Sequence, residues 1–103
     1  MPFFTATYSY SEDVEARDRV RPDHREYLGA LVDQGQLLLA GGFGPDDPAG
    51  AMLIFTASDI EEVRKIVAAD PFSISGVIMS TDIRSWTPVL GASVAALSAP
   101  TTT

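Results

Sequence analysis

The chain opens with a run of aromatic and β-branched side chains. Residues 3–10 read FFTATYSY, a pattern typical of a β-strand. Apolar runs at residues 36–40 (QLLLA) and 51–56 (AMLIFT) predict two more strands, each with apolar side chains on both faces. A fourth strand is expected at residues 76–87, where a change of phase before Trp86 indicates a β-bulge.

Between the first two strands, the sequence predicts a helix over residues 22–34. Pro22 suits the first position of a helix because the N–H that it lacks has no partner there, and Leu28 and Leu31 follow at helical spacing. Gly35 is expected to end the helix in the left-handed conformation. This places His24, the only histidine, in the first helical turn.

The segment before this helix, residues 11–20, is highly charged. It has too few apolar side chains to pack deeply, and we expect at most a short helical turn capped by Ser11.

A second helix is predicted after the third strand. The stretch Ser58-Asp59-Ile60-Glu61 has the spacing of a capping box that starts at Ser58. An apolar stripe with helical period continues to about Ala69. Asp70-Pro71 is expected to end the helix, because the residue before a proline avoids helical geometry.

The resulting order, βαββαβ, predicts an α+β fold of the ferredoxin-like type. Right-handed connections turn this order into a four-stranded antiparallel sheet with both helices on one face. The same topology brings His24 and Asp70 to one edge of the sheet. We expect residues 1–90 to form one domain and residues 91–103, which carry no charged side chain, to form a C-terminal tail.

The strands that are apolar on both faces raise the question of what covers the second face. The helices cover one face only, and a large exposed apolar face is unusual for a monomer. We therefore expect a homodimer in which a second copy of the chain covers this face.

Composition limits the class of partner. The net charge of −7 argues against nucleic acid and anionic membranes as partners. A single histidine and no cysteine give no cluster of metal ligands, and no phosphate-binding glycine motif precedes a helix, so we expect neither metal nor cofactor. With neither a signal-like segment nor an apolar run long enough to span a bilayer, a cytoplasmic protein is expected.

Four of the seven basic residues nonetheless gather in one short segment: Arg17, Arg19, Arg21 and Arg25. Two interpretations remain open. The arginines either bind a small anion or pair with neighbouring carboxylates on a solvated surface.

Four motifs, taken in order, resemble the YciI-like (YCII-related) family. They are Arg21-x-x-His24-x-x-Tyr27-Leu28, Gly35-x-Leu37 before Ala40-Gly41, Asp70-Pro71-Phe72, and Gly76-Val77. The resemblance implies a dimeric α+β barrel of ferredoxin-like subunits, with His24 and Asp70 as the active-site pair. One branch of this family resembles dehydrochlorinases that act on chlorinated hydroxyquinol-type aromatics. Gly42-Phe43 departs from the family's Ala-Gly-Pro turn, and this alters the loop over the expected pocket.

The chemistry that these residues support is proton transfer. A carboxylate beside an imidazole fixes its tautomer and leaves the other ring nitrogen free to act as general acid–base. If His24 lies in a first helical turn, the helix dipole disfavours the imidazolium while Asp70 favours it. Arg21 is expected to bind an anionic group of the substrate.

The remaining expected contacts are the backbone amides of Gly41 and Gly42 and an apolar wall of Tyr8, Phe43 and Phe72. The hypothesis is a small cofactor-free enzyme that acts on an anionic cyclic or aromatic metabolite by elimination, dehydrochlorination or isomerisation. Two alternatives remain: a purely structural His24–Asp70 hydrogen bond, and a non-catalytic dimeric module that binds a small molecule or accompanies another enzyme.

Overall fold

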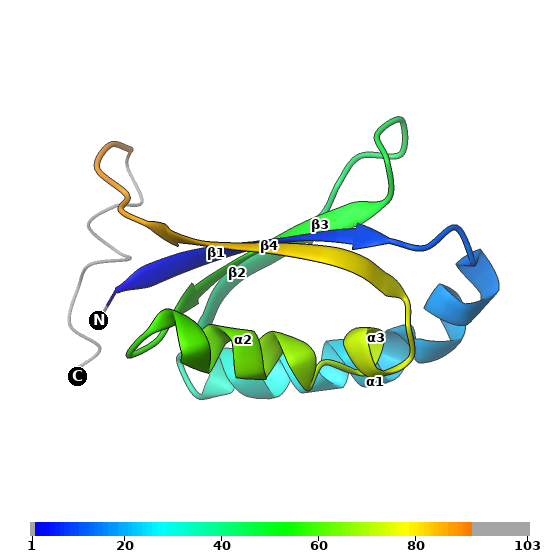
Figure 1. Cartoon of the computed structure of the whole chain (residues 1–103), viewed down its shortest axis with the longest axis horizontal. Helices are drawn as coiled ribbons and strands as arrows, with labels where there is room; N and C mark the ends of the chain where they lie inside the picture. The colour runs from blue at the N-terminus through cyan, green and yellow to red at the C-terminus, as the bar shows by residue number, and fades with distance from the viewer. Residues whose placement is uncertain (1, 92–103) are drawn as a thin grey trace.

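Seven helices and strands in the computed structural model, which describes residues 2–91, form a single layer of sheet and a single layer of helices (Figure 1). The strands form one antiparallel sheet in the order β2-β3-β1-β4. Their bounds are β1 (Phe3–Tyr10), β2 (Leu37–Gly42), β3 (Gly50–Thr56) and β4 (Ile78–Trp86). The helices α1 (Val14–Asp33), α2 (Ile60–Ala68) and α3 (Pro71–Ile74) lie on one side of that sheet. The predicted α+β ferredoxin-like fold is therefore confirmed.

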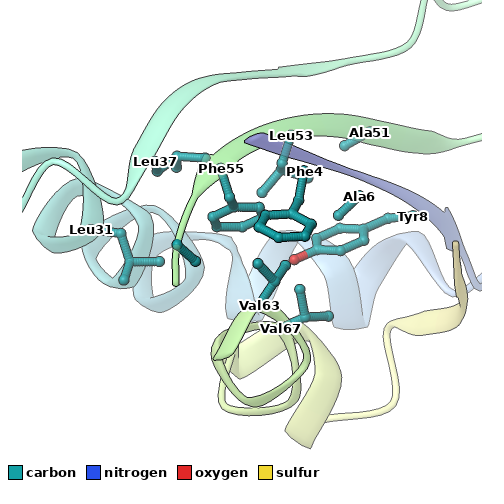
Figure 2. Close-up of a cluster of buried hydrophobic side chains, with 11 residues drawn as sticks. Phe4, Ala6, Tyr8, Leu31, Leu37, Ala51, Leu53, Phe55, Val63 and Val67 are labelled. Carbon is teal, nitrogen blue, oxygen red and sulfur yellow. The ribbon is translucent and has the colours of Figure 1, made fainter. Parts of the chain in front are cut away.

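The core lies between the sheet and the helices, and strand register determines its composition. Alternate residues of β1 face the helices, and each pairs with an inward-facing residue of β3: Phe4 with Phe55, and Ala6 with Leu53. Figure 2 shows these side chains packed over Val63 of α2. The buried cluster comprises Phe4, Ala6, Tyr8, Leu31, Leu37, Ala51, Leu53, Phe55, Ala57, Val63 and Val67. Burial of this apolar surface is the main force that holds the two layers together.

The opposite face of the sheet is open in the single chain. Leu39, Met52 and Trp86 alternate with the inward-facing residues, and they are 58%, 40% and 36% exposed. No helix of residues 2–91 covers this face (Figure 1). The apolar outer face expected from the sequence is thus present, and what covers it stays a proposal.

Helix α1 begins eight residues earlier than predicted, and Pro22 lies inside it. The Asp13 carboxylate caps the helix by accepting a hydrogen bond from the Ala16 amide at 3.0 Å, so the cap is Asp13 and not Ser11. Pro22 is exposed, and the hydrogen bond that it removes is therefore on the solvated side of the helix. The end was predicted well: Gln34 is the C-cap, and Gly35 follows with φ +78°.

This longer helix corrects the expectation that His24 lies in a first turn. His24 follows Val14 by ten residues, about three turns of helix. The dipole effect is confined to the terminal turn. The positive end of α1 therefore does not act on His24.

Helix α2 also starts one residue later than predicted. The capping residue is Asp59, whose carboxylate accepts from the Glu62 amide at 2.9 Å, while the Glu62 side chain accepts from the Ser58 amide at 3.1 Å. Asp59 and Glu62 take the roles expected of Ser58 and Glu61, but the Glu62 side chain accepts from the residue before the N-cap, so the capping box is not fully reciprocal. Asp70 ends this region as predicted, and it also starts α3, a short helix that the sequence did not predict.

The sheet departs from the prediction in two further places. The irregularity of β4 lies at its start, where the register with β1 shifts between Ser9 and Tyr10, and not before Trp86. Strand β2 continues through Gly41 and Gly42, two residues beyond the predicted end at residue 40. Gly50, the first residue of β3, admits no side chain, because a Cβ there would collide with the Tyr8 carbonyl. Each difference lies at the end of the sheet next to His24 and Asp70.

No helix within residues 2–91 is long and apolar enough to cross a membrane. The expected tail falls almost entirely outside the described residues.

Candidate active site

A buried hydrogen-bonded pair joins α1 to the loop between α2 and α3. His24 Nδ1 lies 2.7 Å from Asp70 Oδ1 and 3.0 Å from Asp70 Oδ2. Asp70 is 0% exposed and His24 is 7% exposed. A buried carboxylate needs a partner of this kind, because a lone buried charge is costly. The structure brings together the two residues that the topology predicted at one edge.

Asp70 is held in place by its local backbone. As the N-cap of α3, its Oδ1 accepts a hydrogen bond from the Phe72 amide at 2.9 Å. Pro71 occupies the first position of this helix, where its missing N–H costs nothing. The carboxylate is therefore fixed before it meets His24, which is the arrangement expected of a residue that orients an imidazole.

The imidazole ring of His24 is positioned by an aromatic stack. It lies parallel to the Phe72 ring, with centroids 3.8 Å apart and an interplanar angle of 8°. Phe72 in turn meets the Tyr10 ring edge-on, at a centroid distance of 5.4 Å. Because Asp70 occupies Nδ1, Nε2 is the ring nitrogen left to exchange a proton with a ligand.

A cavity of about 550 Å³ lies beside this stack. Its walls come from α1, from the end of β2 and the β2–β3 loop, and from α3. The lining includes His24, Arg21, Phe72, Gly41, Gly42 and Phe43, which the sequence analysis had named. The volume is within the range of small-molecule sites in proteins, roughly 300–1,000 Å³.

Tyr8 is the exception among the expected wall residues. Its ring is 1% exposed in the core and does not line the cavity. Burial, and then the negative charge of Asp70, raises the pKa of Tyr8 far above its ordinary value. Tyr8 therefore stays a neutral phenol behind the site, and Tyr10 supplies the aromatic wall instead.

The carboxylate of Asp70 also affects the pKa of Tyr10 and of Tyr27. Burial first, and then the charge of Asp70, raises the pKa of both hydroxyl groups, while Arg17 and Arg21 act in the opposite direction on Tyr10. The hydroxyl of Tyr27 donates a hydrogen bond to the Ile66 carbonyl at 2.6 Å and so ties α1 to α2. Neither tyrosine is placed to act as a base near neutral pH.

Arg17 also lines the cavity. The sequence placed it in the charged segment of residues 11–20 and in the basic cluster, but not among the expected site residues. It lies on the same face of α1 as His24, two turns closer to the N-terminus. Positions 17, 21, 24 and 28 have helical spacing and lie on one face of the helix. This pattern is recognised only when charged residues are counted together with apolar ones.

Arg21, which was expected to bind the anion, lines the cavity but pairs with a neighbour. Its Nη1 lies 2.6 Å from Asp18 Oδ1. Of the two interpretations of the basic cluster, pairing within a solvated surface thus describes Arg21. Arg17 makes no ion pair within residues 2–91.

Gly41 and Gly42 line the cavity as residues of the edge strand β2. A Cβ at Gly41 would meet no atom within 4 Å, so close packing does not demand glycine at this position. Contact between these amides and a ligand remains a prediction. In the part of the chain that the structure describes, no group of three His, Cys, Asp or Glu side chains is placed to hold a metal ion.

Fold and site together define a small ferredoxin-like α+β protein with a buried histidine–aspartate pair beside a cavity. The YCII-related domain matches residues 1–87, and the chain belongs to this family. The family resemblance inferred from the four motifs is therefore confirmed.

One curated relative and two solved structures illustrate the similarity. Derivative of benzaldehyde biosynthesis cluster protein C from Emericella nidulans is 28% identical over 81 residues, which span 70% of this chain and 83% of the relative. The 5-chloro-2-hydroxyhydroquinone dehydrochlorinase TftG from Burkholderia phenoliruptrix AC1100, solved with 2,5-dihydroxybenzoquinone, is 25% identical. Its TM-score is 0.71, over 82% of this chain and 93% of that one.

An antibiotic biosynthesis monooxygenase shares the fold at 20% identity and a TM-score of 0.56, over 87% of this chain and 100% of that one.

Proposed function

We propose that this protein is a small cytoplasmic enzyme that uses His24 as general acid–base, oriented by Asp70. Its substrate is a small anionic cyclic or aromatic metabolite, and the reaction is an elimination, dehydrochlorination or isomerisation that needs no cofactor. The observation that carries the proposal is the bidentate contact of His24 Nδ1 with a fully buried carboxylate beside a cavity.

The geometry supports proton transfer at one atom. Asp70 accepts from Nδ1–H and so leaves Nε2 with the lone pair that removes a proton. When Nε2 gains that proton, the negative charge of Asp70 stabilises the imidazolium that forms. The stacked Phe72 ring prevents the imidazole from turning away.

The proposed step balances without an external oxidant or reductant. Nε2 removes a proton from a saturated ring carbon, which a hydroxylated aromatic ring presents in its keto tautomer, and the C–H electron pair forms a double bond to the adjacent ring carbon. In an elimination, the leaving group on the adjacent carbon departs with its bonding pair, as chloride does in dehydrochlorination. In an isomerisation, Nε2 returns the same proton to a different carbon. The imidazolium of an elimination gives its proton to solvent.

Similarity to the dehydrochlorinase TftG supports this class of reaction. That enzyme is 25% identical and covers most of the chain, and its structure contains 2,5-dihydroxybenzoquinone, a planar acidic ring. Chlorinated hydroxyhydroquinones and halogenated phenols are therefore the first substrates to test, followed by unsaturated lactones.

The test measures turnover of this panel by chloride release and by ultraviolet absorbance. His24→Gln and Asp70→Asn should each lower kcat by about 10²–10⁴-fold, the usual contribution of a general acid–base. Asp23→Asn is the matched control for charge. Asp23 is exposed and directly precedes His24, and the variant should keep the full rate.

Equal rates for the wild type and His24→Gln would overturn the acid–base proposal. Saturable binding of panel members without turnover would favour the non-catalytic binding module. No observation in residues 2–91 favours that module over the enzyme.

The proposal includes a homodimer formed through the outer face of the sheet. Leu39, Met52 and Trp86 give that face an apolar surface that a second copy would bury. Leu39→Glu should convert the dimer to a folded monomer in analytical ultracentrifugation. Val32→Glu, at an exposed position on α1, should leave the mass unchanged. A wild-type mass of one chain at micromolar concentration would refute the dimer.

A further inference from the structure

Three arginines of α1 line the cavity, and they differ in their ion pairs and in their exposure to solvent. Arg21 pairs with Asp18, and Arg25 is exposed to solvent. Arg17 is half-buried and has no ion pair within residues 2–91, and its Nη1 is enclosed by protein without a hydrogen-bond partner. A charge that is partly removed from water and left unpaired is costly. Such a group is suited to receive a counter-charge from a ligand.

The guanidinium of Arg17 is held in place by the site itself. Its Cζ lies 5.6 Å from the centroid of the Tyr10 ring, in a cation–π contact. Tyr10 packs edge-on against Phe72, and Phe72 stacks on His24. Arg17, Tyr10, Phe72 and His24 thus form one continuous row of contacts along the wall of the cavity.

The charges around the cavity favour an anion. Asp47, in the β2–β3 loop, is the one acidic residue among the described side chains of the lining, against the three arginines. The buried carboxylate of Asp70 is already engaged by His24 and by the Phe72 amide. Arg17 forms an ion pair with neither of these carboxylates.

The positions of Arg17 and His24 on α1 fix the distance between them along the helix. Arg17 and His24 are seven residues apart, which places them on the same helical face at a rise of about 10 Å. A ligand that meets both must carry its negative charge at one end and its reactive atom at the other. The aromatic wall between the two residues suits a planar ring as the connecting part.

We propose that Arg17 binds the anionic group of the ligand, a carboxylate or ring oxyanion on a planar ring, and that Arg21 does not. The assignment of the ring's other end to His24 rests on the proposed acid–base function. The assignment of the anion to Arg17 does not depend on catalysis.

The test compares two ring ligands of the same shape, benzoate and the neutral benzamide, by their shifts of backbone amide resonances around the cavity. In the wild type, benzoate should bind with millimolar affinity and benzamide about tenfold or more weakly, the usual worth of one charged hydrogen bond. Arg17→Gln should weaken benzoate by a similar factor and leave benzamide unchanged.

The matched control is Arg19→Gln, which makes the same charge change at an exposed position of the same helix, outside the cavity lining. It should bind both ligands as the wild type does. Arg17→Lys, which keeps the charge but loses the planar fork, should retain part of the preference for benzoate. If Arg17→Gln fails to fold by circular dichroism, Arg17→Lys and the two ligands on the wild type decide the question.

Any one of three results would overturn the proposal. These are equal or undetectable binding of benzoate and benzamide to the wild type, an Arg17→Gln effect no larger than that of Arg19→Gln, and a full loss of the preference in Arg21→Gln instead. Failure of the catalytic proposal is recognised separately. In that case His24→Gln keeps its turnover or no substrate turns over, while benzoate binding still depends on Arg17.

Discussion

The inner face of α1 has two halves with the same geometry and different contents. Arg17, Arg21 and His24 recur at helical spacing in the first half, and Tyr27, Leu28 and Leu31 continue the same stripe in the second. The second half packs on the apolar core, although Leu28 also reaches the cavity, and the first half lines the cavity. One helix therefore stabilises the domain with one end and forms a wall of the cavity with the other. Helical period alone does not distinguish these roles.

Removing a core contact in the second half should have the largest effect on stability. Leu31 is 6% exposed, and Leu31→Ala should lower the free energy of unfolding by about 3 kcal/mol through lost burial and a residual cavity. The neighbouring Val32 is 53% exposed, and Val32→Ala should change it by less than about 0.5 kcal/mol. Urea denaturation measures both. Similar losses in the two variants would contradict the division of α1 into faces.

Alkaline pH tests how burial and the negative charge of Asp70 affect Tyr8 in the core. Burial, and then the charge of Asp70, raises the pKa of Tyr8, so the folded state keeps this phenol protonated where the unfolded chain loses the proton, above about pH 10. The unfolded state then binds fewer protons. Stability is fully present below about pH 10 and should fall above it by about 1.4 kcal/mol per pH unit for each such tyrosine.

Urea denaturation on both sides of pH 10 measures this slope, and Tyr8→Phe should flatten it. An unchanged slope in that variant would exclude Tyr8 as the group responsible.

The tyrosine at the start of the core half gives a smaller effect. Tyr27→Phe removes the hydrogen bond to the Ile66 carbonyl and should cost about 1 kcal/mol. Tyr10→Phe is the comparison, because the Tyr10 hydroxyl has no hydrogen-bond partner within residues 2–91. Equal midpoints of thermal unfolding for the wild type and Tyr27→Phe would show that the bond contributes nothing.

The smallest change is expected in the cavity half. Arg21 pairs with Asp18 in a partly exposed i,i+3 contact, a type of pair usually worth less than about 0.5 kcal/mol. Arg21→Gln should therefore leave the urea midpoint nearly unchanged. A loss comparable to that of Leu31→Ala would show that the first half of α1 supports the fold as strongly as the second.

The two halves also differ in what could be predicted from sequence. Leu28, Leu31 and Gly35 defined the second half, because apolar periodicity and a left-handed glycine are direct signals. The first half has no apolar periodicity, and Pro22 is typical of a helix start, so α1 was predicted too short. Its inclusion in the helix depends on the Asp13 cap and on the exposed position of Pro22, which tolerates a missing hydrogen bond.

The same contrast applies to the site. Connectivity alone predicted that His24 and Asp70 meet, because strand and helix directions fix which ends share an edge. The aromatic stack and the free charge of Arg17 depend on side-chain packing between segments distant in sequence, and they were not predictable from periodicity. Tyr8 was expected in the apolar wall, but β1 places its ring on the inner face of the sheet, and the sequence does not indicate how deep in the core that ring lies.

Asp70 caps α3 and, in the proposed function, orients His24, and these two roles tolerate different substitutions. The start of α3 is equally well served by serine, threonine, asparagine or aspartate. Orientation and charge stabilisation of an imidazole require a carboxylate. Descendants that abandoned proton transfer would be free to drift at position 70 among the small polar residues without losing the fold. The identity of that single residue therefore separates inheritance of the architecture from inheritance of the chemistry.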